Sequence, residues 1–148
     1  MTRIALFTVG LAAAAAGVGA EQLQKINPDG LSTPQTYTHV VRAGKTVYIA
    51  GQVGATADGK VVGPGMPEQL DQVLKNLATA LKSQGGDFSH LAKITVFVTS
   101  IDEFRAPEAR AVRDRHFGAN RPASTLVQIQ RLAAPEYKVE IEAIAVLP

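Results

Sequence analysis

Alternating apolar and polar positions divide much of the chain into short strands. Side chains of a strand point to its two faces in turn, so alternation over about four to eight residues indicates a half-buried strand. Glycine, proline, asparagine and aspartate separate these segments, as they do at turns. The predicted strands cover residues 38–42, 45–50, 94–99, 125–130 and 138–146, and residues 43–44 form the turn of a hairpin between the first two.

Two further segments have the apolar spacing of amphipathic helices. The first begins near Pro67, which suits the first turn of a helix, and ends at Gly85-Gly86. The second runs from Pro107 to Phe117. The expected inward positions are Leu70, Val73, Leu74, Leu77, Ala80 and Leu81 in the first helix and Ala111, Val112 and Phe117 in the second. The order of elements predicts a two-layer α+β domain with two helices on one face of a mixed sheet.

Two glycines stand at the end of the second predicted strand, at positions 51 and 54. A glycine within a strand is typical of a bulge or of a place where another group approaches the backbone closely. We therefore expect Gly51 and Gly54 to mark such a place. Asp58-Gly59 is a turn signal, after which residues 61–62 are expected to pair back.

The last predicted strand carries apolar residues on both of its faces. One face carries Val139, Ile141, Ala143 and Ala145, and the other carries Glu140, Glu142, Ile144 and Val146. If helices cover the first face, Ile144 and Val146 need a different cover, and a two-layer domain has no third layer to supply it. We therefore predict that copies of the chain associate.

Glu140 and Glu142 lie on the same face of that strand, about 6.5 Å apart along it. Near an interface, partial removal of water would raise a carboxyl pKa toward neutrality, the range that a general acid or base needs. The alternative is that both carboxylates are exposed at the strand end or ion-paired, with Lys138 and Arg131 as available partners.

Composition narrows the classes of function. The 148 residues include 15 Lys and Arg, 13 Asp and Glu, three His and no Cys. The formal net charge of +2 is too small for a dedicated nucleic-acid binder. Without cysteine there is no disulfide framework, thiolate metal site or cysteine nucleophile, and His39, His90 and His116 lie far apart. We therefore expect no metal, no cofactor and no nucleic-acid partner.

The first 20 residues differ from the rest of the chain. Arg3 precedes an apolar stretch over residues 4–16, and small residues lead up to Ala20 before the polar Glu21. This is the pattern of a secretory signal peptide with cleavage after Ala20. An uncleaved membrane anchor or an unstructured terminus is the alternative, although a spanning helix needs about 20 strongly apolar residues. We expect residues 21–148 to form one domain that is exported, to the periplasm or beyond the cell, with no membrane attachment after cleavage.

Three segments resemble the RidA (YjgF) family of reactive-intermediate deaminases. They are Gly51-Gln52 after a hairpin, the run Arg-Pro-Ala-Ser-Thr-Leu-Val over 121–127, and the run Val-Glu-Ile-Glu-Ala-Ile-Ala over 139–145. The likeness extends over about residues 26–147. It implies a chorismate-mutase-like fold, a homotrimer, and a small-molecule cleft at each subunit interface. It also implies hydrolysis of enamines and imines, such as 2-aminoacrylate and its imine tautomer, to 2-oxo acids and ammonia.

The resemblance also suggests the residues of the site. Glu140 matches the glutamate that handles water, Tyr37 matches a tyrosine lining the cleft, and Gly51 and Gln52 match a cleft wall. Ser124 stands where the deaminases carry the arginine that binds the substrate carboxylate. A hydroxyl supplies one neutral donor in place of a charged fork, so the usual 2-imino acid substrates are in doubt. Ser124 and Thr125 are expected to offer hydrogen bonds instead.

Three functions follow from this reading. The first is hydrolysis of an imine, an enamine or a related reactive metabolite, with Glu140 handling water. The second is a non-catalytic trimer that binds a metabolite in the same cleft. The third, ribonuclease action or inhibition of translation, fits least, because the net charge is small and the chain has three Tyr and no Trp for base stacking.

Overall fold

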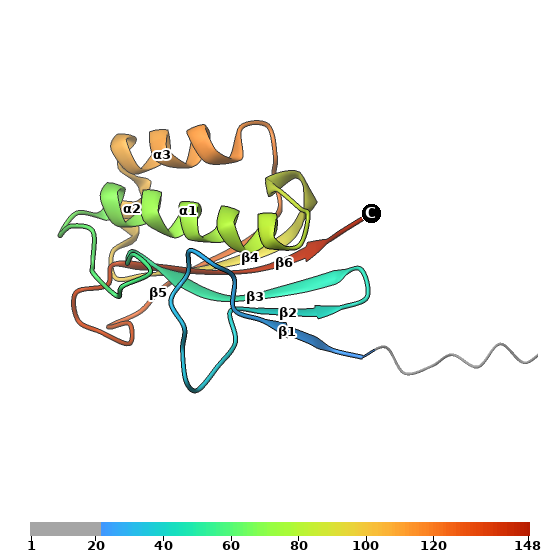
Figure 1. Ribbon diagram of the computed structural model, residues 1–148. Coiled ribbons are helices and arrows are strands. Elements are labelled where there is room, and N and C mark those ends of the chain that lie inside the picture. The colour runs from blue at the N-terminus through green and yellow to red at the C-terminus, as the bar shows by residue number, and fades with distance from the viewer. Residues whose placement is uncertain (1–21) are drawn as a thin grey trace, which may run out of the picture.

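The computed structural model describes residues 22–148 as a sheet with helices packed on one of its faces (Figure 1). The predicted signal peptide lies outside the described residues. The strands are β1 (Gln24–Ile26), β2 (Val40–Ala43), β3 (Thr46–Val53), β4 (Leu91–Val98), β5 (Ala123–Gln128) and β6 (Val139–Val146). The helices are α1 (Met66–Ser83), the 3-10 turn η1 (Phe88–His90), α2 (Ile101–Arg105) and α3 (Pro107–Phe117).

The six strands form one mixed sheet in the order β1-β2-β3-β6-β4-β5. Only β4 and β5 pair in parallel, and α2 and α3 supply the crossover between them. The hairpin of β2 and β3 is as predicted, and an isolated bridge between Ala55 and Val61 confirms the expected return of the chain. The terminal strand β6 is central, between β3 and β4. The backbone of β6 is therefore hydrogen-bonded to a neighbouring strand on each side.

The core lies between the sheet and the helix layer. The apolar stripe of α1 is fully buried, as its spacing predicted. On β6 the alternation also holds, because its first face is buried against the helices while Glu142 and Val146 on the other face are exposed. Asp71 on α1 joins α3 through its carboxylate, which lies 2.7 Å from a guanidinium nitrogen of Arg115 and 2.7 Å from Nε2 of His116. The prediction of a two-layer α+β fold is confirmed.

In the described part of the chain, no helix covers the other face of the sheet (Figure 1). Tyr48 and Val146 are each 48% exposed there. A groove of about 390 Å³ is lined by Tyr48, Lys93, Glu142 and Ile144, among others. The predicted partner surface is thus present, and its cover by a second copy stays a prediction.

Several features differ from the sequence prediction. The elements β1, η1 and α2 were not expected, and each is only three to five residues long. In α3, Ala109 is buried and Ala111 is exposed, the reverse of what was expected for Ala111. Within residues 22–148, no helix has the length and apolar character required to span a bilayer.

Candidate functional site

Glu140 lies directly against the backbone of Gly51. The pairing of β3 with β6 shifts register between Ile49 and Gln52, so the strand bulges at this point. A Cβ atom at Gly51 would stand 1.8 Å from Oε1 of Glu140, so no larger residue leaves the carboxyl where it is. A Cβ atom at Gly54 would stand 2.5 Å from the Cβ atom of Gln69 on α1, again too close for a real contact. The expectation of close approach at both glycines is confirmed.

The carboxyl group of Glu140 is partly removed from water. Burial, with a smaller contribution from the charge of Glu142, raises its pKa above the ordinary value. Among residues 22–148, no Lys, Arg or His nitrogen lies within 4.0 Å of the carboxyl oxygens of Glu140. The expected partner Lys138 pairs with Glu103 instead, at 2.8 Å. Glu140 is therefore a carboxyl that exchanges a proton at a higher pH than an exposed glutamate does, as a general acid or base must.

A small hollow of about 100 Å³ adjoins Gly51. Its lining includes Tyr37, His39, Gln52, Asn76 and Tyr137. Tyr37 is half exposed and stands edge-on to His39, with 5.3 Å between ring centroids. Part of the segment between β1 and β2, which carries Tyr37, projects on the side of the sheet away from the helices (Figure 1). The structure thus brings Tyr37, Gly51 and Gln52 together around one hollow, and of these three Gly51 lies against Glu140.

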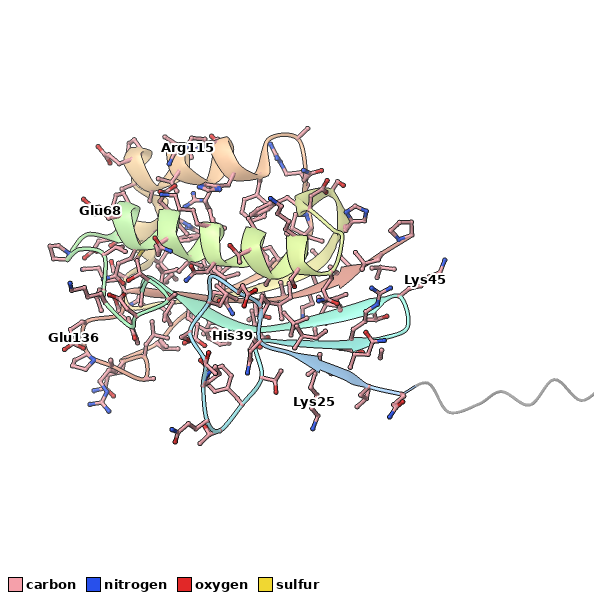
Figure 2. The ribbon with its side chains drawn as sticks, in the orientation of Figure 1. Lys25, His39, Lys45, Glu68, Arg115 and Glu136 are labelled. Carbon is pink, nitrogen blue, oxygen red and sulfur yellow. The ribbon has the colours of Figure 1, made fainter. Side chains whose placement is uncertain are left out.

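Gln52 and His39 form a buried polar link under this hollow. Nε2 of Gln52 donates to the carbonyl of Ala50 at 2.8 Å and lies 3.2 Å from Nδ1 of His39. Because an amide nitrogen only donates, Nδ1 accepts, and the ring proton sits on Nε2, 3.1 Å from Oγ of Ser32. Burial lowers the pKa of His39, which favours this neutral form. His39 lies where the projecting segment meets β2 (Figure 2), so the link ties that segment to the bulge of β3.

Two buried amides on α1 hold the strands that carry the site. Nδ2 of Asn76 donates to the carbonyls of Val53 and Ala55, at 3.1 and 2.9 Å. The side chain of Gln69 accepts from the backbone N–H of Lys138 at 2.9 Å and donates to the carbonyl of Glu136 at 2.8 Å. The helix therefore anchors the end of β3, which pairs with Glu140, and the chain that enters β6, the strand that carries Glu140.

Ser124 and Thr125 lie on β5, away from Glu140. The strand β4 stands between β6 and β5, and Thr125 faces Thr95, which in turn faces Glu142. Thr125 thus shares the uncovered face of the sheet, about 10 Å from Glu142 at the spacing of two strands. Ser124 points to the opposite face, with Ile94, and lines a separate hollow beside α3. One chain therefore does not bring these two residues to Glu140.

His39, Asn76 and Tyr137 contribute to the site and were not among the expected site residues. Asn76 carries a readable signal, since it is a polar residue within the apolar face of α1, four residues before Ala80. A buried amide in such a place needs hydrogen-bond partners from outside its own helix. The loop positions of His39 and Tyr137 carry no comparable pattern. Among residues 22–148, no group of three or more His, Cys, Asp or Glu side chains could hold a metal ion.

Known proteins are similar to this chain in sequence and in fold. Residues 29–147 match the family described as Endoribonuclease L-PSP. The human 2-iminobutanoate/2-iminopropanoate deaminase is 33% identical over 111 residues, which cover 74% of this chain and 79% of the human protein. The goat (Capra hircus) protein of the same description is 37% identical over 111 residues, with the same coverage.

Solved structures of known proteins have a similar fold. RidA from the Antarctic bacterium Psychrobacter sp. is 28% identical with a TM-score of 0.76, and the match covers 84% of this chain and 99% of that one. Yeast Mmf1 is 26% identical with a TM-score of 0.79, over 86% and 100% of the two chains. The fold is therefore that of the RidA proteins. The chain belongs to the Endoribonuclease L-PSP family, which includes RidA (YjgF), as the three sequence segments predicted.

Proposed function

We propose that this protein hydrolyses a small imine or enamine to a carbonyl compound and ammonia, with Glu140 as the residue that handles water. The observation that carries the proposal is the half-buried carboxyl of Glu140 against Gly51, which has a raised pKa and no cationic partner within the described residues. The relatives described as 2-iminobutanoate/2-iminopropanoate deaminases support this class of reaction.

The chemistry needs one group that moves a proton in both directions. Glu140 takes a proton from water as the water oxygen bonds to the imine carbon, and it passes a proton to the nitrogen. Glu140 then takes the hydroxyl proton of the resulting carbinolamine and returns a proton to its nitrogen, so that the carbon–nitrogen bond breaks, ammonia leaves and the carbonyl forms. A carboxyl whose pKa is raised toward the working pH serves as both base and acid in these steps.

The proposed site is completed by a neighbouring copy. The uncovered sheet face carries Tyr48, Ile144 and Val146, which suit burial in a homotrimer. In this arrangement β5 is the free edge of each sheet, so Ser124 and Thr125 of one copy can approach Glu140 of the next. The cleft for the small molecule then lies between subunits.

A pair of matched variants tests the proposal. Glu140→Gln and Glu142→Gln each remove one carboxylate from the same face of β6, and only the first removes the group packed against Gly51. Release of ammonia is measured with 2-iminobutanoate generated in place and with an imine that lacks a carboxylate. We expect Glu140→Gln to lower kcat by about 10² to 10⁴ for whichever imine is turned over, and Glu142→Gln to leave it within a few fold.

The alternatives give different results. Saturable binding with no turnover of any imine would favour the metabolite-binding trimer. Equal losses in the two variants would remove the special role of Glu140.

A further inference from the structure

A second hollow, of about 200 Å³, lies between the end of α3 and the start of β5. Its polar lining comprises Arg113, Asp114, Asn120, Arg121 and Ser124. Arg113 and Asp114 come from α3, Ser124 comes from β5, and the other two come from the connection between these elements. Four side chains able to donate hydrogen bonds thus converge on one small space.

Arg113 is held in place by Phe104. Its guanidinium lies 4.2 Å from the centre of the Phe104 ring, and Nη1 donates to the carbonyl of Phe104. The residue is half-buried, and no carboxylate lies within 4.0 Å of it among residues 22–148. A partly desolvated cation of this kind gains from an anion that reaches its free nitrogens.

Arg121 is oriented in a similar way. Its Nη1 donates to the carbonyls of Gly118 and Asn120, at 2.5 and 2.9 Å. These bonds fix the guanidinium at the end of α3 and leave its second terminal nitrogen without a protein acceptor in the described part of the chain. Two guanidinium groups with free donors therefore line the same hollow.

The charge of the hollow selects the kind of anion. Asp114 is the one acidic residue in its lining, and the carboxylate of Asp114 lies 3.9 Å from Nε of Arg110, outside the lining. Two arginines and one aspartate leave one net positive charge, which a monoanion balances and a dianion exceeds. A volume of about 200 Å³ suits a compact ligand, since pockets for drug-sized molecules begin at about 300 Å³.

We propose that this hollow binds the carboxylate of a small organic acid between the guanidinium groups of Arg113 and Arg121, with Ser124 donating a further hydrogen bond. The carboxylate site stands on its own geometry. Its use as an anchor for substrate rests on the function proposed above. If a neighbouring copy brings Ser124 to Glu140, these arginines supply the cation that position 124 itself lacks, and acids carrying an imine become substrates.

Binding is measured with sodium 2-oxobutanoate, the carbonyl product of 2-iminobutanoate hydrolysis, at constant ionic strength. The readout is the NMR signal of each arginine Nε–H. Arg121→Gln removes the exposed arginine of the hollow, and Arg105→Gln is the matched control, because Arg105 is an exposed arginine at the end of α2 outside the lining. Arg113→Lys retains the charge and the stem over Phe104 but loses the planar fork.

We expect the Arg113 and Arg121 signals to shift saturably. The Kd should rise about tenfold or more in Arg121→Gln, rise in Arg113→Lys, and stay unchanged in Arg105→Gln. Equal weakening in Arg121→Gln and Arg105→Gln, or no saturable shift, would overturn the site. Tighter binding of sulfate than of 2-oxobutanoate would overturn its assignment to a carboxylate.

The two proposals fail separately, because this readout does not depend on turnover. A wild-type chain that binds 2-oxobutanoate through Arg121 but hydrolyses no imine retains the carboxylate site and loses the proposed function. A chain whose hydrolysis depends on Glu140 and is unaffected by Arg121→Gln retains the function and loses the anchor.

Discussion

Adding one methyl group at Gly51 tests the geometry of the site. In Gly51→Ala the new Cβ atom would stand 1.8 Å from Oε1, 2.6 Å from Cδ and 2.9 Å from Cγ of Glu140. Real Cβ contacts below 3.0 Å essentially never occur, so Oε1 must move by about 1.2 Å or more. The backbone of Gly51 does not have a positive φ, so the substitution acts through this contact alone.

The displacement predicts a large effect on rate and a small one on stability. A shift of about 1 Å in a catalytic group can lower the rate by about 100-fold. The clashing atoms are the end of a flexible side chain, which swings aside, so we expect the free energy of unfolding to change by less than about 1 kcal/mol. Gly51→Ala should therefore fold normally and lose about 99% of its imine hydrolysis.

Gly54→Ala is the matched control. Its Cβ atom would stand 2.8 Å from the Cα atom of Gln69, which belongs to the backbone of α1 and cannot swing aside. We expect that variant to lose about 1–3 kcal/mol of stability. Urea unfolding and initial rates of ammonia release distinguish the two patterns.

A double-mutant cycle tests whether the new methyl group at position 51 meets the side chain of Glu140. Glu140→Ala removes all three atoms that the new methyl group meets, so adding Gly51→Ala to it should have no further effect on unfolding. Two results would show that the carboxyl does not lie against Gly51. One is a Gly51→Ala chain with wild-type kcat, and the other is a loss of stability from Gly51→Ala that is as large in the Glu140→Ala background as in the wild type.

Three further predictions concern the charge, the scaffold and the open face. Burial raises the pKa of Glu140 above 4.5, so ionising this carboxyl destabilises the folded state as the pH rises. The Tm of Glu140→Gln should therefore match that of the wild type below about pH 4 and exceed it increasingly at higher pH. Gln69→Leu leaves three backbone groups without their partner and should cost about 2–5 kcal/mol in urea unfolding, whereas a loss under 1 kcal/mol would contradict the role of the amide. Val146→Lys alters a side chain that is 48% exposed in the single chain, so it should lower the mass seen by light scattering without unfolding the subunit; an unchanged mass would mean that this face is not the contact.

The sequence predicted the elements whose periodicity is long enough to read. The six apolar positions expected to face inward in the first helix were sufficient for α1, and alternation over 139–146 gave both faces of β6. The strand β1 pairs only three residues, and its pattern does not differ from that of a loop. The helix α2 carries a capping signal in the sequence, since Ser100 stands three residues before Glu103 and accepts from its N–H at 3.2 Å.

The site was predictable only in part. Gly51 was expected to mark a close approach because glycine in a strand permits one, but the group that approaches comes from β6, about 90 residues later in the chain. Arg113 packs on Phe104 of α2, a helix that the pattern did not predict. Long-range pairings of this kind depend on the topology, which local patterns do not contain.

The most direct test of the account is an NMR titration of the Glu140 carboxyl carbon in the wild-type chain, assigned by comparison with Glu140→Gln. We expect a pKa clearly above the ordinary value of 4.5, because the half-buried carboxyl lies against Gly51 and feels the charge of Glu142. A midpoint at or below 4.5 would contradict it, since the carboxyl would then be solvated or paired with a cation.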